Sequence, residues 1–261
     1  MPIYLYLDRR TFIHRLHPTV KILAVVAIFW SVYWVDNPLW LLPLGVLLMA
    51  GAQLTRAWPN FYSLRWLFVL LVFATTLTWT IFYRQGKPLL HLGPLFVSRA
   101  SLEYGLGRGI KLAELLATSV LFLSTTKVEE FAFGLGELGV PYRVGFAITL
   151  AFRLVPLFID SALTVVQAQS LRGYDFDSGS LITRVRRYVP VTVPVFMGAL
   201  RKANNMAMAL EARGFGYGTR PTSHVHYEIR PLDILTLIGV ILLGAAYFLI
   251  YYTGHGAIAP G

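Results

Sequence analysis

Residues 21–56 read KILAVVAIFWSVYWVDNPLWLLPLGVLLMAGAQLTR. Two apolar runs, residues 22–35 and 39–54, flank the turn Asp36-Asn37-Pro38. Basic residues stand at the outer end of each run, and tryptophan and tyrosine gather beside the turn. Lys and Arg concentrate in cytoplasmic loops, whereas aromatic residues collect where the membrane meets water. The pattern therefore predicts a membrane hairpin whose two outer ends lie in the cytoplasm.

The composition of the whole chain also indicates a membrane protein. Hydrophobic residues make up 56% of the 261 residues, charged residues only 14%, and the mean hydropathy is +0.60. Soluble domains have about 45–50% apolar and about 25% charged residues. Cysteine is absent, which excludes disulfides, thiolate nucleophiles and Cys-ligated zinc. The net charge of +10 fits cytoplasmic loops near anionic lipid, so we expect the lipid bilayer and no nucleic acid as partner.

Three further apolar runs cover residues 67–83, 102–124 and 232–252, and a loop at residues 84–100 separates the first two of these. Each run is about as long as a span of the hydrocarbon core requires. The sequence predicts an all-α polytopic membrane protein with about five transmembrane helices and a cytoplasmic N-terminus. We divide it into a membrane part at residues 1–124, a cytoplasmic or interfacial coupling-helix region at 125–231, and a last span with an external tail at 232–261.

The middle region, residues 125–231, differs from the rest of the chain because its apolar pieces contain charged residues. Residues 144–171 and 189–212 are apolar enough for spans, but the first piece holds Arg153 and Asp160 and the second holds Arg201 and Lys202. A charge in the centre of a span costs about 2.5–3.5 kcal/mol on insertion scales. We therefore expect long amphipathic helices at the cytoplasmic face. The alternative is a protein of seven spans in which these charges are paired.

A short pattern, Ala-x-x-x-Arg-Gly-aromatic, occurs twice in this region, 41 residues apart: Ala168 to Tyr174 and Ala209 to Phe215. Glycine just past the last turn is a common helix stop, so both helices should end there. The helix macrodipole explains one arginine at a helix end. Two copies favour a pair of protruding helix ends that present guanidinium groups to acidic grooves of a partner, since guanidinium pairs bidentately with carboxylate.

Small residues are frequent in both helices and predict that the two helices cross closely, although helix propensity alone would also favour alanine. They are Ser161, Ala162 and Ala168 in one helix, and Gly198, Ala199, Ala203, Ala207 and Ala209 in the other.

A phosphate-binding loop of the form Gly-x-x-x-x-Gly-Lys-Ser/Thr is absent from the sequence, so any ATP must be bound by another chain. The nearest pattern, residues 105–109 (Gly-Leu-Gly-Arg-Gly), opens the fourth run and is interpreted as a flexible entry to that span.

The two arginine motifs resemble the paired Ala-Arg-Gly signatures of a known family, the transmembrane (T) component of energy-coupling factor (ECF) importers for vitamins and metal ions. The resemblance extends in the same order over nearly the whole chain, and Leu171 departs from the alanine that is usual there. Further segments support it, namely His14 to Lys21, Gly139-Val140-Pro141 and Arg153-Leu154-Val155-Pro156.

The resemblance implies a division of labour in the cell membrane of a prokaryote. The chain would lie between a substrate-binding membrane subunit (S component) and two ABC ATPases, would not be an enzyme, and would hold no cofactor of its own. The residues implied in ATPase coupling are Leu171, Arg172, Gly173, Ala212, Arg213 and Gly214, with Ala168 and Ala209 in support.

Two other classes of protein remain open, a membrane-embedded transferase and a self-contained secondary carrier. Asp175 and Asp177 could be the paired acids of a transferase, but such an enzyme needs more acids at helical spacing. A carrier should show inverted repeats and charges near the bilayer middle. The histidine pairs His14/His17 and His224/His226 lack a third ligand, so we expect no metal site. In the division of labour that the resemblance implies, another chain selects the transported substrate.

Overall fold

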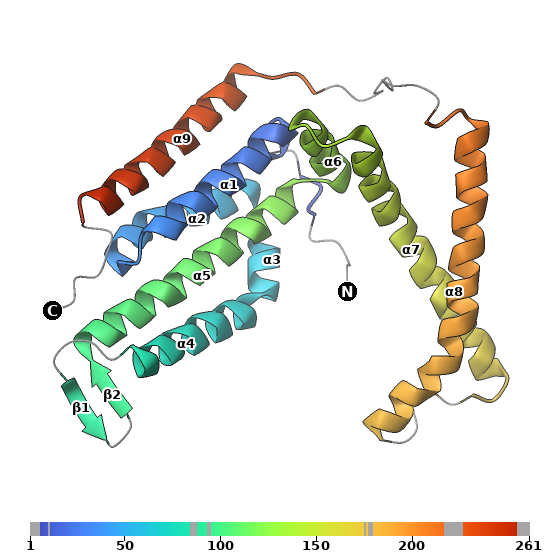
Figure 1. Ribbon diagram of the computed structural model, residues 1–261, viewed down its shortest axis with the longest axis horizontal. Coiled ribbons are helices and arrows are strands. Elements are labelled where there is room, and N and C mark those ends of the chain that lie inside the picture. Colours follow the sequence, from blue (N-terminus) through green and yellow to red (C-terminus); the bar gives the residue numbers. More distant parts are fainter. Residues whose placement is uncertain are drawn as a thin grey trace. The chain divides into compact units, whose positions relative to one another are not determined.

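The computed structural model describes residues 6–9, 11–83, 88–92, 95–174, 176, 180–216 and 227–254 (Figure 1). The chain divides into two compact units. The first comprises Met1–Gly139 together with Tyr227–Gly261, and the second comprises Val140–His226.

The first unit is built of helices. In chain order these are a 3-10 turn η1 (Ile13–Arg15), α1 (Pro18–Trp34), α2 (Pro38–Thr55), α3 (Trp58–Ser63), α4 (Arg65–Phe82), α5 (Arg99–Thr125), α6 (Val128–Glu137) and α9 (Pro231–Tyr252). A short antiparallel hairpin, β1 (Pro88–Leu92) and β2 (Leu95–Ser98), lies in the segment that we predicted as a loop. The prediction of an all-α polytopic membrane protein is confirmed, with this hairpin as a local addition.

Four helices in the described part of the chain are long and apolar enough to cross a membrane: α2, α4, α9 and, in the second unit, α7 (Tyr142–Leu171). Helix α1 is apolar but has 17 residues. The predicted fourth span forms one continuous helix, α5, which carries more charge than these. By length and composition alone α7 qualifies as a span, although its charges led us to predict an interfacial helix.

Helices α1, α2, α5 and α9 share the core of the first unit. Its buried members are Val32, Val35, Leu41, Leu44, Leu48 and Tyr247. The hydroxyl of Tyr247 in α9 donates a hydrogen bond to the carbonyl of Trp40 in α2, at 2.9 Å. The last helix of the chain is therefore fixed to the first membrane hairpin.

The glycines of residues 105–109 do not form a flexible entry, and that interpretation is wrong. They lie inside α5, and each occupies a close helix contact. A Cβ added at Gly105 would lie 2.7 Å from the carbonyl oxygen of Thr76, and one at Gly109 would lie 2.6 Å from Thr76 Oγ1. Glycine lets helix backbones approach closely. Gly105 and Gly109 therefore pack α5 tightly against α4, and Gly107 lies against the turn between α1 and α2.

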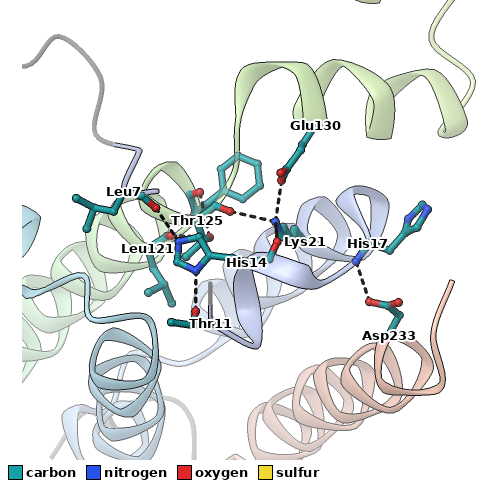
Figure 2. A network of polar contacts seen from close by, with 10 residues as sticks. Leu7, Thr11, His14, His17, Lys21, Leu121, Thr125, Glu130 and Asp233 are labelled. Carbon is teal, nitrogen blue, oxygen red and sulfur yellow. Dashed lines mark hydrogen bonds and ion pairs between the residues drawn. The ribbon is translucent and has the colours of Figure 1, made fainter. Parts of the chain in front are cut away.

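A polar network holds the beginning of α1 and the residues just before it to three other helices (Figure 2). Lys21 Nζ donates to the carbonyls of His14 (2.9 Å) and Thr125 (3.0 Å) and to the carboxylate of Glu130 (2.8 Å) in α6. The carboxylate of Asp233, at the start of α9, accepts a hydrogen bond from the backbone N–H of His17 at 2.8 Å. The segment from His14 to Lys21 thus joins α1, α5, α6 and α9.

The second unit is a pair of long helices, α7 and α8 (Leu181–Ala212). They contact each other, and Phe215, just after the end of α8, packs on Phe146 in the second turn of α7 (Figure 1). The two helices therefore run in opposite directions.

Candidate functional site: two arginine-bearing helix ends

Helix α7 ends as the sequence predicts. Gly173 has a φ of +86°, a left-handed conformation that residues with a Cβ rarely adopt. Its N–H donates to the carbonyl of Ser170 (2.9 Å), and the N–H of Tyr174 donates to the carbonyl of Gln169 (3.1 Å). This pair of bonds is the Schellman motif, which satisfies carbonyls that the helix end leaves free.

Helix α8 ends in the same way. Gly214 has a φ of +76°, its N–H donates to the carbonyl of Glu211 (2.9 Å), and the N–H of Phe215 donates to the carbonyl of Leu210 (2.9 Å). The two copies of the sequence motif therefore have one backbone geometry, with arginine as the last residue before the left-handed glycine.

Both arginine ends are open to the surroundings. Arg172 and Arg213 are exposed, as are Gly173, Ala212 and Gly214, and Leu171 reaches an exposed fraction of 90%. Among the residues that the structure describes, neither guanidinium is within 4 Å of a carboxylate. Ala168 and Ala209, one turn earlier on the same helix faces, are also exposed. Each guanidinium is therefore exposed and, within the described part of the chain, forms no ion pair.

The aromatic residue of each motif links its helix end to the beginning of the other helix. After α8, Phe215 packs on Phe146 of α7, with ring centroids 4.3 Å apart. After α7, Tyr174 contacts Phe176 (5.1 Å), and Phe176 contacts Tyr188 of α8 (5.0 Å). The antiparallel pair is thus closed at both ends by aromatic contacts, and the two arginines lie at opposite ends of it.

Sequence reasoning missed Phe146, Phe176 and Tyr188 as supports of the motifs. The sequence shows an aromatic residue after each Arg-Gly pair, but no pattern in the sequence identifies the residues against which it packs.

Part of the predicted stripe of small residues in α8 faces outward. A Cβ added to Gly198 would find no atom within 4 Å, and Ala203, Ala207 and Ala209 are exposed, whereas Ala199 of α8 and Ser161 and Ala162 of α7 are half-buried. The two helices are in contact, and the prediction that small residues form this contact stays a prediction.

The charges in the middle of the two helices also face outward. Arg153, Asp160, Arg201 and Lys202 are exposed, and no ion pair within 4 Å joins them to any residue that is described. The paired charges that a seven-span protein would require are therefore not formed within this part of the chain.

His14 and His17 do not come together as a metal pair. His14 Nε2 donates to the carbonyl of Leu7 (3.0 Å), and its Nδ1 accepts a hydrogen bond from the hydroxyl of Thr11 (2.6 Å). The ring of His17 points to a different side in Figure 2 and packs edge-on against Phe133. Burial lowers the pKa of His14 below its ordinary value of 6.5, which favours the neutral ring.

Four residues of the other candidate sites lie outside the described residues, namely Asp175, Asp177, His224 and His226. Within the described ranges, no group of three or more His, Cys, Asp or Glu is placed to hold a metal ion.

The fold and these two helix ends define a polytopic helical membrane protein with a duplicated arginine motif. Comparison with known proteins gives the family. A family model described as CbiQ, cobalt transport protein, matches residues 9–225, and the chain belongs to this family.

Individual relatives agree with the resemblance to the T component of ECF transporters. The chain is 28% identical to the energy-coupling factor transporter transmembrane protein EcfT of Streptococcus equi, over 93% of this chain and 94% of that protein. It is 30% identical to the EcfT protein of Thermanaerovibrio acidaminovorans, over 84% of this chain and 83% of that one. A putative ABC transporter ATP-binding protein of Bifidobacterium longum is 29% identical over 90% of this chain, in a match that covers 31% of its own length.

Proposed function

We propose that this chain couples ATP hydrolysis by two ABC ATPase subunits to a substrate-binding membrane subunit, in an ECF-type importer for vitamins or metal ions. Arg172 and Arg213 would each dock into an acidic groove of one ATPase. The observation that carries the proposal is the equivalence of the two helix ends, in which the same backbone geometry exposes the same side chain.

The antiparallel arrangement of α7 and α8 supports two partners rather than one. An antiparallel pair with the same motif at each C-terminal end is approximately two-fold symmetric. Two related ATPases that close on each other would present two equivalent grooves, and symmetric assemblies use equivalent contacts. Closure of the ATPases would then move both helix ends at once.

Arginine suits this contact for a chemical reason. Its guanidinium stays charged when it leaves water, and its planar fork forms two parallel hydrogen bonds to one carboxylate. The glycine that follows permits the chain to turn sharply away, so that the helix ends at the guanidinium.

ATP binding belongs to another chain in this proposal, because the sequence lacks a phosphate-binding loop. The similarity to part of a putative ABC transporter ATP-binding protein is in keeping with a close functional link between this type of chain and an ATPase. The family description mentions cobalt, but the bound substrate would be chosen by the S component.

The orientation that we propose places both arginine ends and the N-terminus in the cytoplasm, as the basic residues of the sequence favour. The apolar side chains exposed on α7 and α8, such as Leu163, Val193 and Phe196, would contact the S component or lipid.

The test is co-purification and ATP-dependent uptake with both ATPases and the S component, using Arg172→Ala, Arg213→Ala and the double variant. Arg153→Ala and Arg201→Ala are matched controls, since they remove an exposed arginine from the middle of the same two helices. We expect each motif variant to lose ATPase binding or uptake and the controls to retain both. If the double variant assembles and transports like the parent, the proposal is wrong. ATP-independent uptake by this chain alone would instead support a self-contained carrier.

A further inference from the structure

A carboxyl group inside the first unit is not explained by the coupling function. Glu114 of α5 is only 4% exposed, and both of its carboxyl oxygens are buried without a hydrogen-bond partner among the described residues. The other buried charges differ, because Lys21, Lys111 and Asp233 each have hydrogen-bond partners. A buried polar group without a partner is costly, and a charged one more so. A group of this kind suggests that something else completes its bonds.

Glu114 faces a cavity of about 450 Å³ that is bounded by α2, α3, α4 and α5. The walls are otherwise almost entirely apolar and include Met49, Phe61 and Val72. Gly45 of α2 lies opposite the carboxyl, and a Cβ added there would be 3.2 Å from Glu114 Oε1. The absence of a side chain at this position makes room for the carboxyl group. At the rim, Leu42 and Val69 are 53% and 59% exposed, so the cavity opens towards the surrounding lipid.

Arg65 is the second charged residue that lines this cavity. Its guanidinium lies over the ring of Tyr62, 3.8 Å from the centroid, and forms no ion pair with Glu114 within 4 Å. Helices α4 and α5 are antiparallel, since Gly105 faces Thr76 and Thr80 whereas Gly109 faces Val72 and Thr76. Continuing that register at 1.5 Å per residue places the backbone of Glu114 about one turn, or roughly 6 Å, along the helix axis from the backbone of Arg65.

The cavity therefore offers an acid and a base on two neighbouring helices, within apolar walls that open to lipid. We propose that it binds a zwitterionic aminophospholipid, whose primary ammonium donates hydrogen bonds to Glu114 and whose phosphate pairs with Arg65. Such a headgroup carries one charge of each sign, which complements these two residues, and its acyl chains would leave through the open rim. This site lies in the first unit and does not depend on the proposed coupling function.

A comparison of choline with ethanolamine phospholipids distinguishes recognition of the headgroup from nonspecific binding of acyl chains in an apolar groove. Both carry the phosphate, but the trimethylated ammonium of choline has no N–H to donate. The full-length chain is purified in detergent and mixed with equal amounts of phosphatidylethanolamine and phosphatidylcholine, and retained lipid is measured by native mass spectrometry. We expect the ethanolamine lipid to be retained preferentially, by about tenfold or more, as the loss of a charged hydrogen bond predicts.

Variants of the two charged residues test separately the contact with the ammonium and the contact with the phosphate. Glu114→Gln should erase the preference for ethanolamine, whereas Arg65→Gln should reduce retention of both lipids. Glu103→Gln is the matched control, because Glu103 lies on the same helix but is half-exposed and paired with Arg99. A thermal melt of each variant reports whether it is folded. Equal retention of the two lipids by the parent, or an unchanged preference in a folded Glu114→Gln variant, would overturn the proposal.

Discussion

The ring of Phe215 lies against the ring of Phe146, with centroids 4.3 Å apart, and this contact joins the end of α8 to the second turn of α7. At the opposite end of the pair, Phe176 meets Tyr188 with centroids 5.0 Å apart. Each arginine-bearing end is thus held by the beginning of the other helix. We expect the direction in which Arg172 and Arg213 point to depend on these aromatic contacts as well as on the helices themselves.

The first prediction concerns Phe215→Ala. This change leaves Arg213 in place but removes an aromatic pair worth about 0.5–1.5 kcal/mol beyond its buried area. We expect the end of α8 to become mobile and ATP-dependent uptake by the assembled transporter to fall. Phe82→Ala is the control, because it removes a ring of the same size that is 75% exposed and lies in α4 of the first unit. Equal uptake by Phe215→Ala and the control would show that the contact does not position the arginine.

The second prediction concerns Gly173→Ala and Gly214→Ala. Both glycines have a left-handed φ, which costs a residue with a Cβ roughly 1–2 kcal/mol. We expect faster amide hydrogen exchange in the last turn of the altered helix and weaker binding of one ATPase. Gly198→Ala is the matched change inside α8, where an added Cβ meets nothing within 4 Å and alanine favours the helix by about 1 kcal/mol. Unchanged exchange in both motif variants would contradict the prediction.

The features that could be predicted from the sequence are those with local causes. The helix stops at Gly173 and Gly214 follow from the conformational freedom of one residue type, and the membrane helices follow from the length and composition of apolar runs. The partners of Tyr174 and Phe215 could not be predicted, because tertiary packing selects them and no periodic pattern marks them.

Residues 105–109 show how a local rule can mislead. Three glycines in five residues predict a break in a helix, since glycine is the weakest helix former after proline. In the structure these positions lie against α4 and the end of α1, where only the absence of a side chain allows the backbones to approach. Packing against a neighbouring helix therefore overrides the propensity. The hairpin β1–β2 was missed for a related reason, because the glycines and prolines around it indicate an irregular loop.

The third prediction tests this packing with Gly107→Ala. A Cβ at Gly107 would overlap the carbonyl oxygen of Asp36, a backbone atom that cannot move aside alone. We expect a loss of at least 1–3 kcal/mol in stability, the usual cost of overpacking, seen as a lower melting temperature in detergent. Gly136→Ala in α6 is the control, since its Cβ would have open space. A melting temperature equal to that of the control would rule out the close contact.

The fourth prediction is a pH dependence that arises from His14. Burial holds the pKa of His14 below 6.5, so the folded protein binds the proton less readily than the unfolded chain. The stabilisation by the neutral ring is complete above pH 6.5 and is lost as the pH falls through the lowered value. We expect the parent to lose more thermal stability between pH 7 and 5 than His14→Gln does, in melts followed at each pH. Parallel curves for the two proteins would mean that His14 does not contribute.

The fifth prediction separates charge from shape at the two helix ends. Arg172→Lys and Arg213→Lys keep the positive charge but replace a planar fork with a single ammonium, which cannot form two parallel hydrogen bonds to one carboxylate. We expect each variant to bind its ATPase about tenfold more weakly than the parent, and more tightly than the alanine variant, since one charged hydrogen bond is worth about 1.5 kcal/mol or more.

Binding of the purified subunits, measured at low and at high salt, checks this, because the lysine variants retain only the contact that salt screens strongly. Arg153→Lys serves as the control on the exposed middle of α7. If both lysine variants bind like the parent, the helix ends act as simple point charges and the bidentate contact with an acidic groove is wrong.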